Sequence, residues 1–313
     1  MTAQHRDAEH AAARPGLMPD MTAPAPGDVD PSDVVHAYLA RNATAIRRAH
    51  DAALLDEPDA VHQLRVGLRR LRSALRSFRT LTVRSSADRL RTELAWLGGE
   101  LGPFREAEVQ VARFAAYSSP GTAAAMALFA ETFHARLSAA RTAMAVALDS
   151  SRCGDLLDAI ADVRRHTRTT AAPPEILARC VAKDWQTLRR RASKVLLAER
   201  GDPAPDLEWH ATRIAAKRAR YAIDAVAPAF AGQATVLAKR MSELTDTLGE
   251  HQDAAQAAEL TARLATEPAG DEAIIALGVV HGIERDRVSM ARRDFAGLWP
   301  AIDTPELTSW FSR

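Results

Sequence analysis

One helical pattern occurs twice in this 313-residue chain and limits the folds that it can adopt. The pattern reads His-x-x-Arg-x-x-x-basic-basic-x-Arg, first from His62 to Arg72 and again from His210 to Arg220. Leu-Gly pairs and a later histidine in each half recur at the same interval of about 147 residues, which indicates a tandem duplication. We therefore expect two similar halves related by a pseudo-twofold axis.

Local sequence signals predict that both halves are helical. The chain is rich in alanine and arginine and only 5% aromatic, a composition that favours helices over strands. The expected fold class is all-α, with residues 1–30 as a disordered leader, repeats at about 31–170 and 174–300, and a C-terminal tail at 301–313. Caps, prolines and glycines divide the repeats into helices at about 31–55, 57–81, 85–117 (broken near 98–103), 120–148, 153–168, 174–200, 206–227, 233–265 (broken at Gly249) and 270–298.

Each copy of the pattern predicts a helix with one cationic side and one apolar side. At 100° per residue the polar residues of each copy share a side. In the first copy these are His62, Arg65, Arg69, Arg72 and Arg76, and in the second they are His210, Arg213, Lys217 and Arg220. The opposite sides are apolar and should be buried: Leu64, Leu68, Leu71, Leu75 and Phe78 in the first copy, and Ala216, Ala219, Ile223 and Val226 in the second.

The cationic sides predict a binding site for an anion. Residues 61–84 contain seven arginines and no carboxylate, so these charges have no partner nearby in the sequence. The planar guanidinium of arginine matches phosphate oxygens and stays charged at physiological pH. Two ladders of such groups suit a linear polyanion held along a groove or channel.

We expect the arginines and Lys217 to hold the ligand, with His62 and His210 as additional donors. The pKa of these histidines should be lowered by neighbouring arginines and raised by a bound anion. The sequence leaves open whether His134 and His281 line the site. Basic residues of the preceding helices could supply further walls: Arg47, Arg48, Arg189, Arg190, Arg191 and Lys194.

The repeated strings resemble a known family. HQLRVGLRRLRSALRSF and WHATRIAAKRARYAIDAV, each followed by a Leu-Gly element (LGPFREAEV and LGEHQDAA), are similar to the two halves of a CHAD domain, the conserved-histidine α-helical domain. The resemblance covers about residues 32–300. It implies two four-helix bundles around a central basic groove or pore that binds inorganic polyphosphate, with Arg70 and Arg218 among the contacts, and a location at polyphosphate granules.

This chain departs from the family pattern after each Leu-Gly pair. The family tends to show Arg-Asp-x-Asp, whereas this chain has Arg105-Glu106-Ala107-Glu108 in the first half and Gln252-Asp253 in the second. We expect these acids to orient arginines or to cap helices.

Several motifs that could indicate catalysis are incomplete in this sequence. Glu131-x-x-His134 occurs once, where a di-iron bundle needs two copies, and His50-Asp51 lacks the further ligands of an all-helical phosphohydrolase site. There is no phosphate-binding glycine-rich loop, and the two cysteines form no metal-binding pattern. We therefore expect a non-enzymatic protein with no catalytic residue, metal or cofactor.

Three alternative functions stay open at this level. They are a metal-dependent phosphohydrolase acting on polyphosphate or nucleotides, a nucleic-acid-binding helical protein, and a scaffold for an acidic protein partner. The net charge of only +1 makes nucleic acid a less suitable specific ligand. The chain has no apolar run of membrane-spanning length and no signal-peptide pattern, so we expect a cytoplasmic protein without a membrane partner.

Overall fold

The described part of the protein is helical throughout. The structure is a computed structural model that describes residues 30–117, 119–168, 173, 175–230, 232–267 and 269–311. Within these ranges it has no strand, only an isolated bridge between Thr82 and Thr167. This confirms the all-α fold class; the predicted leader, apart from Asp30, lies outside the described residues. The α-helices are α1 (Pro31–Leu54), α2 (Ala60–Ser77), α3 (Arg84–Glu100), α4 (Gly102–Ala115), α5 (Ala123–Leu148), α6 (Ser151–Ala161), α7 (Glu175–Ala198), α8 (Asp206–Phe230), α9 (Gln233–Leu264), α10 (Asp271–Leu298) and α11 (Pro305–Thr308).

A side-chain cap begins α1 close to the start that the sequence predicts for this helix. The Asp30 side chain accepts a hydrogen bond from the Ser32 amide at 2.7 Å, so it satisfies one of the free N–H groups of the first turn of α1. The described residues also form four short 3₁₀ segments: η1 (Arg79–Leu81), η2 (Pro120–Thr122), η3 (Val163–His166) and η4 (Trp299–Ala301). Of these, η1, η2 and η3 lie at an end of a helix predicted from the sequence.

The predicted break at Gly249 is wrong, because α9 continues through it. A glycine costs a helix interior about 1 kcal/mol relative to alanine. Leu248 and His251, on either side, are both 1% exposed, and α9 packs against both α8 and α10. Burial along the whole length of the helix outweighs the weak local propensity.

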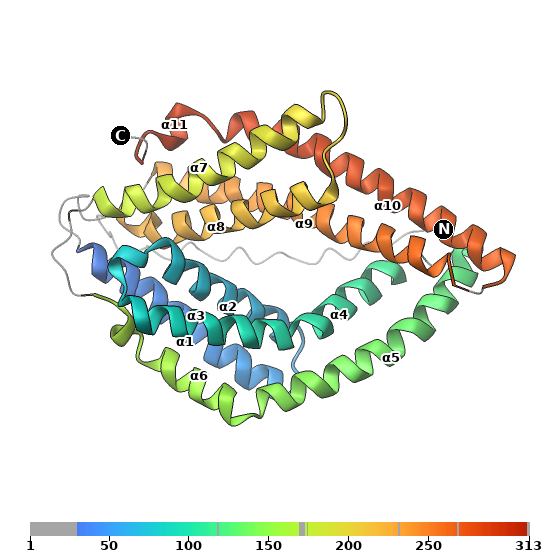
Figure 1. The fold of residues 1–313 in the computed structure, drawn as a ribbon, viewed down its shortest axis with the longest axis horizontal. Coiled ribbons are helices and arrows are strands. Elements are labelled where there is room, and N and C mark those ends of the chain that lie inside the picture. The colour runs from blue at the N-terminus through green and yellow to red at the C-terminus, as the bar shows by residue number, and fades with distance from the viewer. Residues whose placement is uncertain are drawn as a thin grey trace, which may run out of the picture.

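The chain forms two groups of helices that meet at two separate places (Figure 1). One group contains α1–α6 and the other α7–α11. At one end α1 and α2 pack against α8, and α2 also meets α7. At the other end α5 and η2 pack against α10, and α4 meets α9. The tandem repeat and its two four-helix bundles stay predictions, but the two groups correspond to the two halves of the sequence.

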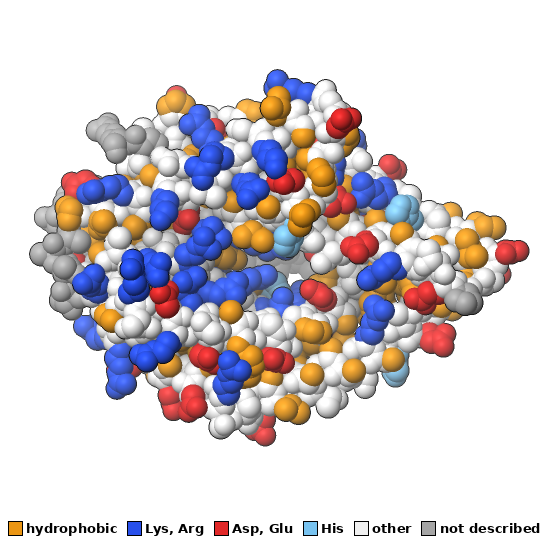
Figure 2. All heavy atoms as spheres, in the orientation of Figure 1, with side chains coloured by type: hydrophobic (Ala, Val, Ile, Leu, Met, Phe, Trp, Pro, Cys, Tyr) orange, Lys and Arg blue, Asp and Glu red, His pale blue; other side chains and the backbone are white. Residues whose placement is uncertain are grey.

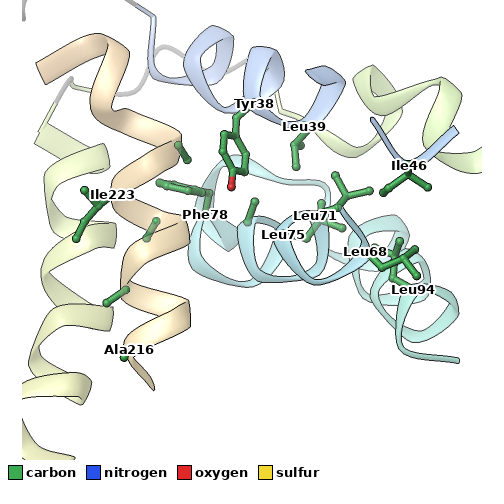
Figure 3. Close-up of a cluster of buried hydrophobic side chains, with 14 of the residues drawn as sticks. Tyr38, Leu39, Ile46, Leu68, Leu71, Leu75, Phe78, Leu94, Ala216 and Ile223 are labelled. Atoms are coloured by element: carbon green, nitrogen blue, oxygen red, sulfur yellow. The ribbon is translucent and has the colours of Figure 1, made fainter. Parts of the chain in front are cut away.

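The apolar faces predicted for α2 and α8 are buried, as Figure 3 shows for part of the core. Every predicted apolar residue on both helices is at most 1% exposed. Gly67 lets α1 and α2 approach closely, since a Cβ atom there would lie 2.7 Å from Cγ1 of Ile46. With one side of α2 fixed in the core, its cationic side must face away from that core.

A buried ionic network joins the two groups at the far end. The guanidinium of Arg113 on α4 donates to Glu284 on α10 at 2.5 and 2.6 Å and to Glu250 on α9 at 2.8 and 3.1 Å. The Tyr117 hydroxyl also donates to Glu284, at 2.5 Å, and this carboxylate is completely buried. An aromatic cluster that includes Phe114 and Phe129 lies beside the network.

The segment predicted as a C-terminal tail is packed as far as the structure describes it. Phe311 is 3% exposed, and its ring centroid lies 5.7 Å from that of Trp185 on α7. The Trp310 ring lies 4.8 Å from that of Phe230 at the end of α8. Residues 301–311 therefore belong to the same core as α7 and α8. None of the helices in the described ranges has the length and hydropathy needed to cross a membrane.

Candidate anion-binding site

A basic groove lies where α2 faces α8. It has a volume of about 740 Å³, and Figure 2 shows Lys and Arg side chains gathered in a hollow between the two groups of helices. Eight cations and a single carboxylate, that of Asp88, are among the described residues that line it. The cations are Arg69, Arg72 and Arg76 of α2, Arg79 of η1, Arg91 of α3, and Arg213, Lys217 and Arg218 of α8.

Helical spacing places these side chains in the groove. Arg69, Arg72 and Arg76 repeat at intervals of three and four, so they lie along one side of α2, spread over about 10 Å at 1.5 Å per residue. Arg213 and Lys217 are related in the same way on α8. Arg72 and Arg76 are exposed, whereas Arg69, Arg213 and Lys217 are half-buried.

The central cations of the groove have no carboxylate partners. In the part of the chain that the structure describes, none of the six cations from α2 and α8 forms an ion pair within 4.0 Å. The other two cations of the lining do: Arg79 and Arg91 contact Asp88 at 2.6 and 2.9 Å. Unpaired like charges repel each other across the groove. A polyanion would relieve this repulsion, which makes the groove a candidate site for negative charge.

The surroundings of Lys217 lower its pKa strongly. Burial, together with Arg213 and Arg69, lowers the pKa of its ammonium to about 7. Burial also lowers the pKa of Arg213 and Arg218, but guanidinium groups start so high that they stay charged at neutral pH. Among the described residues that line the groove, Lys217 is thus the one cation whose charge changes near physiological pH.

One acid after each Leu-Gly pair acts electrostatically on basic residues at or beside the groove. Asp253, which follows the second Leu-Gly pair, acts electrostatically on Arg213 and Lys217, and burial raises its own pKa. In the first half, Glu106 acts on Arg65 in the same way. Within the described ranges, no group of three or more His, Cys, Asp or Glu side chains is arranged to hold a metal ion.

Four predicted site residues adjoin the groove instead of lining it. Arg65 donates to the backbone carbonyl of Gly98 at 2.9 Å. Arg70 lies over the Tyr221 ring, 5.9 Å from its centroid, and Arg220 donates to the Thr245 hydroxyl at 2.7 Å. The pKa of His62 is lowered, first by burial and then by the charge of Arg105.

The second histidine of the pattern faces a different depression. Nδ1 of His210 lies 2.5 Å from Oε1 of Gln252, and both residues line a pocket beside α9 and α10 together with His281. His281 also contacts the backbone carbonyl of Ala258 at 2.9 Å. His134 lies on α5 in an apolar pocket between α4 and α5. Neither later histidine lines the groove.

The basic residues of the preceding helices do not come to the groove. Arg47, Arg48, Arg189, Arg190, Arg191 and Lys194 all lie outside the lining of the groove. Those that have partners use them elsewhere: Arg47 donates to the carbonyl of Leu157 at 3.0 Å, Arg189 pairs with Asp303, Arg190 donates to Thr187, and Arg191 and Lys194 pair with Glu208. Only the inward sides of α1 and α7 face the core, and these residues are on the outward sides.

Sequence reasoning missed Arg79 and Arg91. Arg79 follows Arg76 by three residues and extends the α2 stripe into η1, a signal that the periodicity contained. Arg91 comes from α3, where it shares a side with Asp88. Only the packing of α3 beside α2 brings it to the groove.

Comparison with known proteins identifies the family. A family model described as the CHAD domain matches residues 37–262. The chain belongs to the CHAD domain family. Its fold is similar to the crystal structure of the CHAD domain from the plant Ricinus communis, with a TM-score of 0.65 and 25% identity, covering 94% of this chain and 97% of that one.

Two bacterial proteins are also similar to this CHAD domain. The structure of PptA from Streptomyces chartreusis matches with a TM-score of 0.72 and 25% identity over 86% of this chain and 99% of that one. The uncharacterized protein MT2285 of Mycobacterium tuberculosis (strain CDC 1551 / Oshkosh) is 28% identical over 310 residues, which is 93% of this chain. The chain covers 56% of that relative's length.

Proposed function

We propose that this CHAD domain binds inorganic polyphosphate in the groove between α2 and α8 and does not hydrolyse it. The observation on which this rests is the convergence of six cations that lack ion pairs within the described part of the chain. Arginines form bidentate hydrogen bonds with phosphate oxygens, and an unbranched chain of phosphates offers a charge at every unit. A ligand of this shape can contact Arg69 and Arg76 at once.

The groove suits a bare phosphate chain better than a nucleic acid. Binding of single-stranded nucleic acid relies on aromatic side chains on which bases stack. Of the described residues that line the groove, the single aromatic is Tyr221, which is 7% exposed and has Arg70 over its ring. Lys217 and Arg213 are also half-buried. A narrow phosphate chain reaches such side chains more easily than a strand that has bases.

Binding should depend strongly on salt. If six cations each replace a counterion, the logarithm of the binding constant should fall with the logarithm of the salt concentration with a slope of about −4. Raising the salt from about 0.05 M to 0.2 M should then weaken binding by about two to three orders of magnitude. Long chains should bind more tightly than triphosphate because they reach more of the cations.

A competition assay at physiological salt tests the choice of ligand. Fluorescent long-chain polyphosphate is displaced by unlabelled polyphosphate, triphosphate, ATP, and single- or double-stranded DNA. We expect unlabelled polyphosphate to compete best. Equal competition by DNA would contradict selectivity for polyphosphate, and phosphate release that depends on an added divalent metal would contradict a purely binding role.

Paired charge reversals test the location of the site. Arg69→Glu combined with Lys217→Glu should abolish binding while leaving the helical circular dichroism unchanged. Arg48→Glu combined with Arg190→Glu makes the same change in net charge on exposed residues outside the groove, and it should leave most of the affinity. Similar losses in both double variants would show that net charge alone attracts the ligand.

The proposal extends to location in the cell. A protein that binds polyphosphate through this groove should gather at polyphosphate granules in the cytoplasm. Fluorescence microscopy of the tagged protein tests this, with the Arg69→Glu, Lys217→Glu variant as the control that should stay diffuse.

A further inference from the structure

The stripes of α2 and α8 have the same spacing but end in opposite charges. On α2 the stripe consists of Arg65, Arg69, Arg72 and Arg76. On α8 the positions with the same spacing are Arg213, Lys217, Arg220 and Asp224. Such positions share one side of a helix, so Asp224 lies in line with the cations that precede it.

Asp224 lies within a second basic cluster, formed by Arg41, Arg70 and Arg220. A carboxylate oxygen of Asp224 is 3.8 Å from Nε of Arg220. Asp224 also acts electrostatically on Arg70 and Arg41. A second carboxylate, that of Asp246, lies 4.0 Å from the other side of the Arg220 guanidinium.

The second basic cluster adjoins the groove. Arg220 is close enough to Lys217 to contribute to the lowering of its pKa. Tyr221, which lines the groove, has the Arg70 guanidinium over its ring. The second basic cluster therefore begins beside Lys217 and Tyr221 at the groove, and the two parts differ in their carboxylates.

The cations of the two parts differ in the carboxylates that lie directly against them. Among the described residues, no carboxylate lies within 4.0 Å of the six groove cations from α2 and α8. In the second basic cluster, two carboxylates lie within that distance of Arg220. A phosphate entering this cluster would have to approach Asp224, and like charges in a half-buried site repel strongly.

We propose that Asp224, assisted by Asp246, limits the length of the polyphosphate chain that the protein holds. Asp224 and Asp246 lie against Arg220, and Asp224 also acts on Arg70, so the bound chain extends from Arg76 to Lys217 and ends there. Asp224 is thus a specificity-determining residue that prevents contact with cations which the spacing of the stripes would otherwise supply. This inference rests on the proposed binding of polyphosphate.

Asp224→Asn in the full chain tests the proposal, because it removes the charge and keeps the size. Calorimetric titration with long-chain polyphosphate should show an affinity about tenfold higher than that of the wild type at 0.15 M salt, and a salt slope steeper by about 1.4 because two more cations are engaged. Affinity for tripolyphosphate should change less than about twofold, since a short ligand is already accommodated in the groove.

Asp56→Asn is the matched control. Asp56 forms an exposed ion pair with Arg141 at 2.6 Å, so its replacement changes the net charge equally without affecting the second basic cluster. An equal gain with Asp56→Asn or with tripolyphosphate would overturn the proposal, as would unchanged long-chain affinity in folded Asp224→Asn. If that variant does not fold, Asp246→Asn, whose side chain is 77% exposed, should show a smaller gain of the same kind, and no gain overturns the proposal. Failure of the wild type to bind polyphosphate would instead overturn the proposed function.

Discussion

Replacing Lys217 by arginine should remove the part of the pH dependence of polyanion binding that comes from this residue. In the free protein Lys217 lies among Arg213, Arg69 and Arg220, with Asp253 as the opposing charge, and burial and these neighbours lower its pKa to about 7. A bound polyanion stabilises the ammonium form and raises this pKa. A molecule whose Lys217 is neutral therefore takes up a proton from the solvent when it binds the polyanion.

The size of the effect follows from the lowered pKa of Lys217. At pH 8, one unit above that pKa, about nine in ten free molecules have a neutral amine, so each complex should take up about 0.9 proton; at pH 6 the uptake should be about 0.1. The same equilibrium should weaken binding about tenfold between pH 6 and pH 8. An arginine stays charged throughout this range.

Calorimetry in two buffers with different protonation enthalpies measures this uptake directly. Wild type and Lys217→Arg should differ by about 0.9 proton at pH 8, while titration of the polyphosphate ends is common to both and cancels. Lys217→Gln should also lack the uptake and should bind weakly at both pH values. Equal uptake by the wild type and Lys217→Arg would refute the reasoning, because another group would then bind the proton.

Three further measurements test the packing and the electrostatics. Glu284→Ala should lower the free energy of unfolding by about 3–5 kcal/mol, because it leaves the buried guanidinium of Arg113 without its main partner. Glu93→Ala, at an exposed ion pair, should lower it by at most about 1 kcal/mol, and similar losses in urea unfolding would contradict this difference. Gly249→Ala should raise the free energy of unfolding by about 1 kcal/mol, since the added methyl group meets no atom within 4 Å. Gly67→Ala should lower it by about 1–3 kcal/mol by forcing α1 and α2 apart, and a gain in stability for both variants in thermal unfolding would show that propensity outweighs packing. In the free protein Lys217 loses its proton near pH 7 in the folded state and near pH 10.5 in the unfolded state, so it should make the free energy of unfolding rise with pH between these values. The same pH series on Lys217→Met should lack this part of the rise.

The sequence by itself determined the helices, their apolar faces and the cationic stripes. These features depend on the helical period of 3.6 residues and on capping chemistry, which act within a few turns of chain. For this reason Leu68 and Ala216 were assigned to the core correctly, and Arg69 and Lys217 were found on the sides that line the groove. The false break at Gly249 has the opposite origin, since local propensity was outweighed by burial along α9.

Only the tertiary structure decided which cations share a site. Arg70 and Arg218 hold equivalent places in the repeated pattern, yet Arg218 lines the groove and Arg70 lies over Tyr221 beside Asp224. Arg91 joins the groove from a third helix, and Arg47 faces away from it. A helical period fixes the direction of a side chain relative to its own helix, but which helix lies opposite depends on contacts between residues far apart in the chain, and no local pattern encodes these.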